Sequence, residues 1–117
     1  MTTADLHKLC QSLAGAVEQY PFGPTAAVYK VGGKMFALIG VDADPPSINL
    51  KCEPTLAEQL RDNYPAIQPG YHMNKRHWNT VTVDQSIPDS MVREMVEDSY
   101  DLVFESLPAR VRTQITG

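Results

Sequence analysis

The most constraining feature of the sequence is a pair of adjacent glycines between two β-prone segments. Residues 26–31 and 34–39 are rich in β-branched and aromatic side chains, and only Gly32-Gly33 separates them. Both glycines can adopt positive φ, which the tight turns of β-hairpins require. The sequence therefore predicts an antiparallel hairpin with a two-residue loop, in which Tyr29 pairs with Phe36.

Three further strands are expected from alternating or β-branched segments. They cover residues 47–52, 71–73 and 78–83, and the last two form a second hairpin with 74–77 at its turn. Apolar residues also recur at helical spacing in three segments. These helices are expected from a Thr2 or Thr3 cap up to Tyr20, from Pro54 to Tyr64, and from Pro88 to Leu107.

The resulting element order is α-β-β-β-α-β-β-α. Five mainly antiparallel strands with helices on one face make a two-layer α+β fold. The 117 residues suit a single domain spanning 1–117, in which residues 109–117 form a frayed tail. We found neither a leader-like segment nor an apolar run long enough to span a membrane, so we expect a cytoplasmic protein that does not bind membranes, and we favour a monomer. Cys10 and Cys52 fit reduced, packed thiols.

The charge is unevenly distributed along the chain. The net charge is −4, which argues against strong nonspecific binding to polyanions. Residues 84–105 contain seven acids and one base, whereas residues 25–83 contain six bases and five acids. The last predicted helix therefore carries the acidity, and the sheet region is locally mildly basic.

Alternation along the strands indicates which side chains lie away from the helices. Trp78 is out of phase with Val81 and Val83, so its ring should lie on the open face of the sheet. The side chains expected beside it are Thr80, Thr82, Asn49, Lys51, Lys30 and Met35, with Tyr29 and Phe36 left for the core. An exposed indole suits stacking on a base or a partner's side chain. Alternatively, Trp78 packs under the 65–70 loop or the C-terminal tail, or a bulge reverses the alternation.

The predicted turn of the second hairpin is rich in polar residues. Lys75 and Arg76 could contact phosphates, and Asn74 and Asn79 could bond to base edges or shape the turn. The alternative is a solvated tip whose side chains only define the turn. His72 and His77 have no third metal ligand nearby, so we expect no metal site, and an acid–base role for the pair lacks a nucleophile. No cofactor-binding motif is present in the sequence.

Several segments resemble one protein family. They are Tyr20–Gly23, Lys34–Ala37, Asn49–Cys52, Ser99–Val103 and, most specifically, Pro69–Val81. The chain is identified from these segments as similar to the MmcQ/YjbR family. The resemblance implies a secretion-chaperone-like two-layer fold and a DNA-binding label that rests on a "double wing" architecture. It implies no set of catalytic residues.

Taken together, the residues favour a small non-enzymatic module that binds DNA or another nucleic acid. The candidate contact residues are Lys30, Lys34, Lys51, His72, Asn74, Lys75, Arg76, His77, Trp78 and Asn79. The second hypothesis is a chaperone-like module that binds a protein or peptide through the same face. The third is a small enzyme or ligand-binding protein that uses His72, His77 and Asn79.

Overall fold

The computed structural model describes residues 1–71 and 73–117. Within them the strands form one antiparallel sheet in the order β1-β2-β3-β4-β6-β5. The elements are α1 (Thr3–Ser12), β1 (Val17–Gln19), β2 (Ala26–Val31), β3 (Lys34–Gly40), β4 (Ser47–Lys51), α2 (Pro54–Asn63), β5 (Ile67–Pro69), β6 (Trp78–Thr82), α3 (Asp89–Glu105) and α4 (Ala109–Thr116). The α+β class is confirmed, with six strands rather than five in the described chain.

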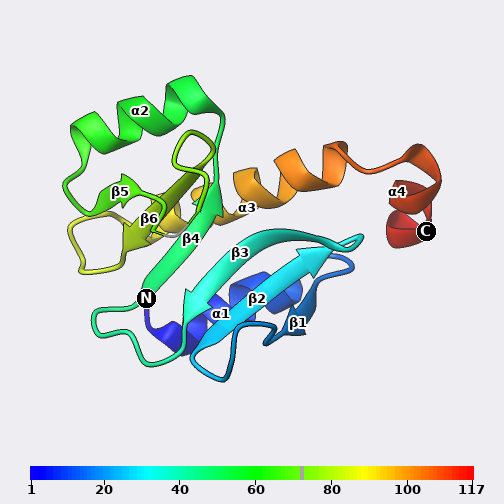
Figure 1. Ribbon diagram of the computed structural model, residues 1–117, viewed down its shortest axis with the longest axis horizontal. Helices are drawn as coiled ribbons and strands as arrows, with labels where there is room; N and C mark the ends of the chain where they lie inside the picture. Colours follow the sequence, from blue (N-terminus) through cyan, green and yellow to red (C-terminus); the bar gives the residue numbers. More distant parts are fainter. Residues whose placement is uncertain (72) are drawn as a thin grey trace.

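Helices cover one face of the sheet. Figure 1 shows α1 and α3 behind the strands, where they contact β3 and each other. α2 packs near β5 at the other end of the sheet. The largest fully buried side chains include Tyr29, Phe36, Leu6, Ile39, Ile48 and Ile67. Burying this aliphatic and aromatic surface is the main force that holds the two layers together.

The β2–β3 hairpin contains a β-bulge that simple alternation does not predict. Lys30 pairs with Met35 as expected, but the register then shifts and Tyr29 pairs with Ala37 instead of Phe36. The extra residue places both Phe36 and Ala37 in the core, each with no exposed surface. The bulge also changes the phase of β3, which determines the side chains that reach the open face.

Ser99 joins α3 to the two strands beneath it. Its hydroxyl donates to the Phe36 carbonyl at 2.6 Å and accepts from the Lys51 amide at 2.9 Å. β3 and β4 pair directly only as far as Ala37 and Leu50. The buried serine therefore satisfies the backbone groups where the ladder ends.

The first helix is shorter than predicted. Thr2 caps it through a reciprocal bond with Asp5, but it ends at Ser12 and does not continue to Val17. The helix ends at its C-cap Leu13, whose backbone is extended, and Gly15, with a φ of +74°, follows in the turn that leads to β1. Val17 instead begins β1, an exposed edge strand that pairs with β2.

The second predicted hairpin is also corrected. Its first arm is β5, Ile67–Pro69, and not residues 71–73; residue 72 lies outside the described residues. The Gly70 amide bonds to the Trp78 carbonyl at 2.8 Å. A Cβ at position 70 would lie 2.9 Å from the Trp78 Cβ, so only glycine fits where the two strands come this close. The chain turns away from β6 after Gly70. Among the described residues between β5 and β6, residues 70, 71 and 73–77 lie outside the strands, and we call this segment loop 70–77.

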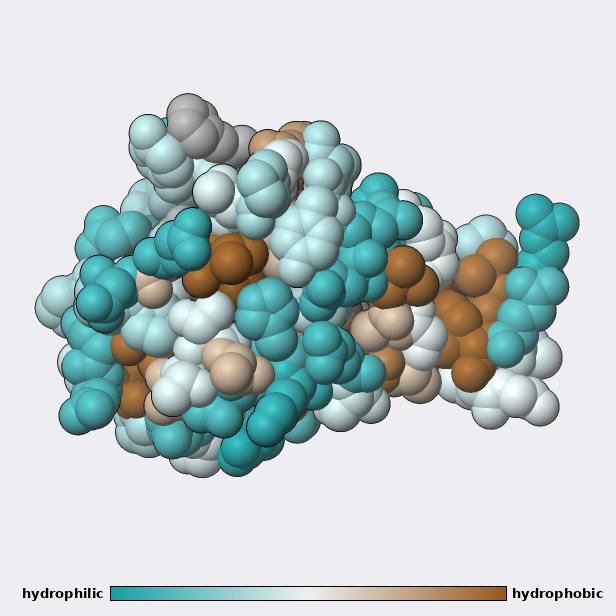
Figure 2. Space-filling model, turned by 90° about the horizontal axis from the view of Figure 1, so that it is seen from below, coloured by the Kyte–Doolittle hydropathy of each residue, from teal (hydrophilic) through white to brown (hydrophobic). Residues whose placement is uncertain are grey.

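The expected frayed tail is a helix. Ala109–Thr116 forms α4 at one end of the long axis of the molecule (Figure 1). Val111 and Ile115, four residues apart, pack against the core, and Ile115 lies against Gly15. Figure 2 shows hydrophobic side chains gathered where α4 meets the rest of the molecule. Within the described residues, no helix has the length and apolar character needed to cross a membrane.

Candidate functional site

Two loops fold over the open face of the sheet and leave a hollow between them. Its volume is about 600 Å³, within the usual range of small-ligand pockets. Loop 20–25 contributes Phe22, and loop 70–77 contributes Tyr71 and Met73. The strands contribute Ala26, Met35, Leu38, Ser47, Asn49 and Thr80. We call this site the open-face hollow.

The rim of the open-face hollow carries two large exposed aromatic rings. Phe22 is 70% exposed and Tyr71 is 71% exposed. The bulge in β3 brings Met35 and Leu38, three residues apart, to the same face. Strict alternation would have separated these two side chains. The hollow therefore offers flat ring faces above a floor of thioether and aliphatic groups.

Asn49 and Thr80 form the polar part of the floor. They are direct cross-strand partners, and the Thr80 hydroxyl donates to Asn49 Oδ1 at 2.5 Å. The Tyr71 amide donates to the same hydroxyl at 3.1 Å, which connects loop 70–77 to the floor. Asn49 is only 9% exposed. This arrangement holds the side-chain amide of Asn49 in one orientation.

Two of the predicted lysines lie next to the open-face hollow. Lys30 pairs across the hairpin with Met35, which lines the hollow. Lys51 is two residues beyond Asn49 on β4, on the same face of the strand. Its cross-strand partner is Trp78. The expected grouping of Lys30, Met35, Asn49 and Lys51 on one face agrees with this geometry.

Asn79 is not available for the role expected of it, and Trp78 does not line the open-face hollow. Trp78 is half-buried, and the aromatic residues of the hollow are Phe22 and Tyr71 instead. Asn79 is 2% exposed on the helix-covered face, so it is not available to a ligand on the open face. Its Oδ1 accepts from Arg61 Nε at 2.7 Å, which makes it a structural residue.

Arg61, on α2, organises the loop that borders the hollow. Besides Asn79, its guanidinium donates to the carbonyl of Lys75 and, at 3.3 Å, to that of Trp78. Asn74 shapes the same loop, because its Oδ1 accepts from the Arg76 amide at 3.0 Å. Sequence reasoning missed Arg61 because its partners are at least 14 residues away in the chain.

The remaining predicted site residues are dispersed. Lys75 and Arg76 are exposed in loop 70–77, whereas Lys34 lies at the hairpin end, where its Nζ donates to Ser106 at 3.4 Å. His77 is half-buried, and its carbonyl accepts from the Cys52 amide. His72 lies outside the described residues. The structure therefore does not bring Lys34 together with the residues at the hollow.

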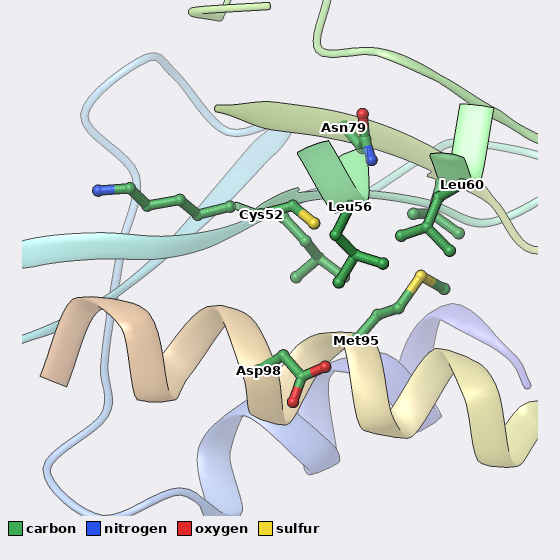
Figure 3. A pocket seen from close by; sticks show the side chains of 9 residues that line it. Cys52, Leu56, Leu60, Asn79, Met95 and Asp98 are labelled. Carbon is green, nitrogen blue, oxygen red and sulfur yellow. The ribbon is translucent and has the colours of Figure 1, made fainter. Parts of the chain in front are cut away.

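The opposite face offers a much smaller cavity. Figure 3 shows Cys52, Leu56, Leu60, Asn79, Met95 and Asp98 around it. Its volume is about 20 Å³, which suffices for about one water molecule. Burial raises the pKa of the Asp98 carboxyl, and the neighbouring acids of α3 raise it further. Both cysteines are free thiols, and burial raises the pKa of Cys10 to about 12.

A polar cluster joins α1 to the edge strand β1. The Tyr29 hydroxyl donates to Glu18, His7 Nδ1 lies 2.6 Å from the same hydroxyl, and Tyr20 donates to Glu18 at 3.0 Å. The bond from Tyr29 holds the pKa of the Glu18 carboxyl below its ordinary value, and burial together with this bond raises the pKa of Tyr29. No cluster of three or more metal-ligating side chains occurs among the described residues.

The lowered pKa of Glu18 predicts a pH-dependent contribution to stability. A carboxyl whose pKa falls on folding stabilises the protein above its unfolded pKa, near 4.5, and this contribution is lost as the pH falls through the folded value. We expect Glu18→Gln to flatten the fall in unfolding free energy between about pH 6 and pH 3. Urea denaturation of both proteins across this range measures the effect. Glu97→Gln, an exposed change on α3, is the control.

Comparison with known proteins identifies the family. The family model described as YjbR matches residues 11–102 of this chain. The chain belongs to the YjbR family. This confirms the family resemblance of its sequence motifs. The uncharacterized protein YbdF of Escherichia coli O157:H7 is 40% identical over 82% of this chain and 79% of its own length. The uncharacterized protein YjbR of Escherichia coli K12 is 35% identical over 96% of this chain and 95% of its own.

Two solved structures share the architecture. The crystal structure of Deinococcus radiodurans protein DR2400 is 36% identical and superposes with a TM-score of 0.92, covering 98% of this chain and 88% of that one. A Pseudomonas syringae protein, 29% identical, superposes with a TM-score of 0.76 over 88% of this chain and 99% of its own. The sheet and its helical layer are therefore common to these relatives.

Proposed function

We propose that this YjbR-family chain is a small binding module that takes single-stranded nucleic acid on its open sheet face. The observation that carries the proposal is the open-face hollow, whose rim carries two exposed aromatic rings and whose floor residues Met35 and Asn49 adjoin Lys30 and Lys51 on the same face of the sheet. Stacking of bases on aromatic side chains and attraction of phosphates to basic groups are the two interactions by which proteins hold single strands. Phe22 and Tyr71 supply the rings, and Lys30 and Lys51 supply the charge.

The distribution of charge supports the same choice of face. The exposed acids of α3, including Glu94, Glu97 and Glu105, belong to the helical layer. Lys30 and Lys51 belong to strands whose open face is turned away from that layer. A polyanion would therefore meet locally positive charge on the open face and repulsion on the other. The net charge of −4 limits the affinity and makes it depend strongly on salt.

The hollow also favours a single strand over a duplex. Its aromatic rims and recessed floor suit unstacked bases, whose faces are hidden inside a double helix. Arg76 and Lys75, exposed in loop 70–77, extend the positive surface beyond the hollow. The strand would therefore run from the hollow toward this loop, with its phosphates near the basic side chains.

Fluorescence anisotropy with a labelled single-stranded oligonucleotide tests the proposal. At low salt we expect saturable binding with a Kd of about 1–100 µM, which is the usual range for weak electrostatic binding. Each lysine–phosphate contact should contribute about 0.7 to the slope of log affinity against log salt. The double variant Lys30→Gln/Lys51→Gln should therefore weaken binding and reduce the slope by about 1.4.

Lys8→Gln is the matched control, because Lys8 is exposed on α1, on the helical side. It removes one positive charge from the helical side and should leave the salt slope unchanged. Absence of saturable binding at low salt would overturn the proposal. Equal losses of oligonucleotide affinity in the control and in the double variant would show that the open face is not the binding surface.

A further inference from the structure

A second surface groove lies between the start of α2 and the outer side of α3. Leu56 of α2 and Leu102 of α3 line it, with exposed fractions of 40% and 36%. No other leucine of the described chain is as exposed. Apolar side chains that gather on the surface inside a polar rim are typical of sites for protein partners.

Four carboxylates line the groove together with the two leucines. They are Glu53, Asp98, Asp101 and Glu105. None of the four makes an ion pair within the described residues. We call the site formed by these acids and the two leucines the acidic groove.

The size of the acidic groove favours a side chain of a larger partner over a free small molecule. Its volume is about 250 Å³, whereas small-molecule pockets usually measure about 300–1,000 Å³. Figure 3 shows Leu56 reaching from α2 toward α3, where Asp98 lies on the facing side. An apolar side chain that enters here therefore meets leucine on both helices and carboxylates around it.

The acids of α3 are spread along the groove. Asp98, Asp101 and Glu105 are three and four residues apart, so they share one face of the helix over about 10 Å. Within the described residues they form no cluster able to hold a metal ion. Their spacing matches several positive charges distributed over a similar length, as lysines or arginines along a helix are.

The charges of the two walls of the groove favour a cationic partner. Burial raises the pKa of Asp98, and its acidic neighbours on α3 raise it further, so a nearby cation would relieve their repulsion. On the α2 side, the amides of Leu56 and Thr55 donate to Glu53 at 3.0 and 3.1 Å. These bonds hold the pKa of the Glu53 carboxyl below its ordinary value and keep it negatively charged.

We infer that the acidic groove docks a basic amphipathic helix of a partner protein. An apolar side chain of that helix inserts between Leu56 and Leu102, and lysines or arginines beside it pair with the acids of α3. A helix that lays its apolar face into a groove is a common mode of peptide recognition. The acidic groove and the open-face hollow share no described lining residue, so the inference does not depend on nucleic-acid binding.

Fluorescence anisotropy with a labelled lysine–leucine peptide of about 14 residues tests the inference. Its leucines recur at helical spacing and form one face, and a second peptide has the same composition in scrambled order. At about 0.15 M salt, which screens distant charges, we expect saturable binding of the amphipathic peptide. The scrambled peptide should bind at least about threefold more weakly, because it offers no continuous apolar face.

Two variants of the groove locate the contact. Leu102→Ser should weaken binding of the amphipathic peptide by about threefold to tenfold, because less apolar surface is buried. Asp101→Asn/Glu105→Gln should weaken it by about twofold to tenfold, because two exposed ion pairs are lost. All three positions are exposed, and circular dichroism checks that each variant is folded. The charge variant decides the matter if Leu102→Ser does not fold.

Matched controls lie outside the acidic groove. Val17→Ser removes an exposed apolar side chain from β1, and Asp42→Asn/Glu58→Gln removes one exposed aspartate and one exposed glutamate. Both should change peptide affinity by less than about twofold. Losses as large as those of the groove variants would show that the peptide binds elsewhere and would overturn the inference.

Two other results would also overturn it. One is equal affinity for the amphipathic and scrambled peptides, or no saturable binding below about 1 mM. The other is dimerisation in analytical ultracentrifugation that Leu102→Ser abolishes, without peptide binding. That result would assign the acidic groove to a second copy of this chain.

Discussion

Replacing Phe36 with alanine is expected to lower the free energy of unfolding by about 3–5 kcal/mol. The side chain has no exposed surface, and its ring packs edge-on against Tyr100 at 5.3 Å and tilted against Tyr29 at 6.3 Å. Removing it leaves a cavity where the bulge in β3 meets α3. Urea denaturation followed by circular dichroism measures the loss.

Phe22→Ala is the control for this prediction. It deletes the same side chain from a position that is 70% exposed, so the unfolding free energy should change by no more than about 0.5 kcal/mol. The same variant should weaken oligonucleotide binding, because Phe22 lines the open-face hollow. A loss of less than about 1 kcal/mol for Phe36→Ala would contradict the assignment of Phe36 to the core.

Replacing Arg61 with alanine is expected to lower the free energy of unfolding by about 2–3 kcal/mol. Three acceptors lose their donor, and one of them, Asn79 Oδ1, is buried in a residue that is 2% exposed. An unpaired buried acceptor is more costly than the mean hydrogen bond. Arg61→Lys should not restore stability, because an ammonium cannot reproduce the planar fork.

The same substitution should also affect the open-face hollow. Arg61 ties the carbonyls of Lys75 and Trp78, and loop 70–77 carries Tyr71 on the rim. Hydrogen exchange at the Gly70 amide should therefore become faster in Arg61→Ala, and oligonucleotide binding should weaken. Arg93→Ala, exposed on α3, is the matched control and should change neither quantity. Unchanged stability and exchange in Arg61→Ala would show that the guanidinium does not hold the loop.

Local signals predicted the parts of the fold that depend on local chemistry. Gly32-Gly33 forms the β2–β3 turn, Thr2 caps α1, and the alternation of β4 and β6 places Lys51 and Trp78 on one face. The segments that resemble the YjbR family also predicted the family correctly. These features need only turn chemistry, capping and strand parity, which neighbouring residues determine.

The errors have a tertiary cause. Val17 fits the helical spacing of α1, but the helix ends before the extended Leu13, and Val17–Gln19 pair with the edge of β2 as β1. Residues 71–73 have strand-like side chains, but the close approach of Gly70 to Trp78 moves the pairing to β5. In both cases a long-range contact overrides a local preference.

The candidate site was only half predictable. Asn49, Met35 and Thr80 were assigned to the open face by parity, but Phe22 and Tyr71 come from loops whose positions depend on the completed sheet. The bulge at Phe36 also brings Leu38 to the hollow, and alternation alone does not show it. Residues on loops over a sheet therefore need coordinates before they can be grouped into a site.

An NMR titration of the isotopically labelled protein with a single-stranded uridine oligomer tests the central claim most directly. The account predicts that the largest shifts occur at the backbone amides of Met35 and Thr80 and at the side-chain NH₂ of Asn49, with little change on α2 and α3. Shifts confined to α2 and α3, or a spectrum that stays the same at saturating oligomer, would contradict it.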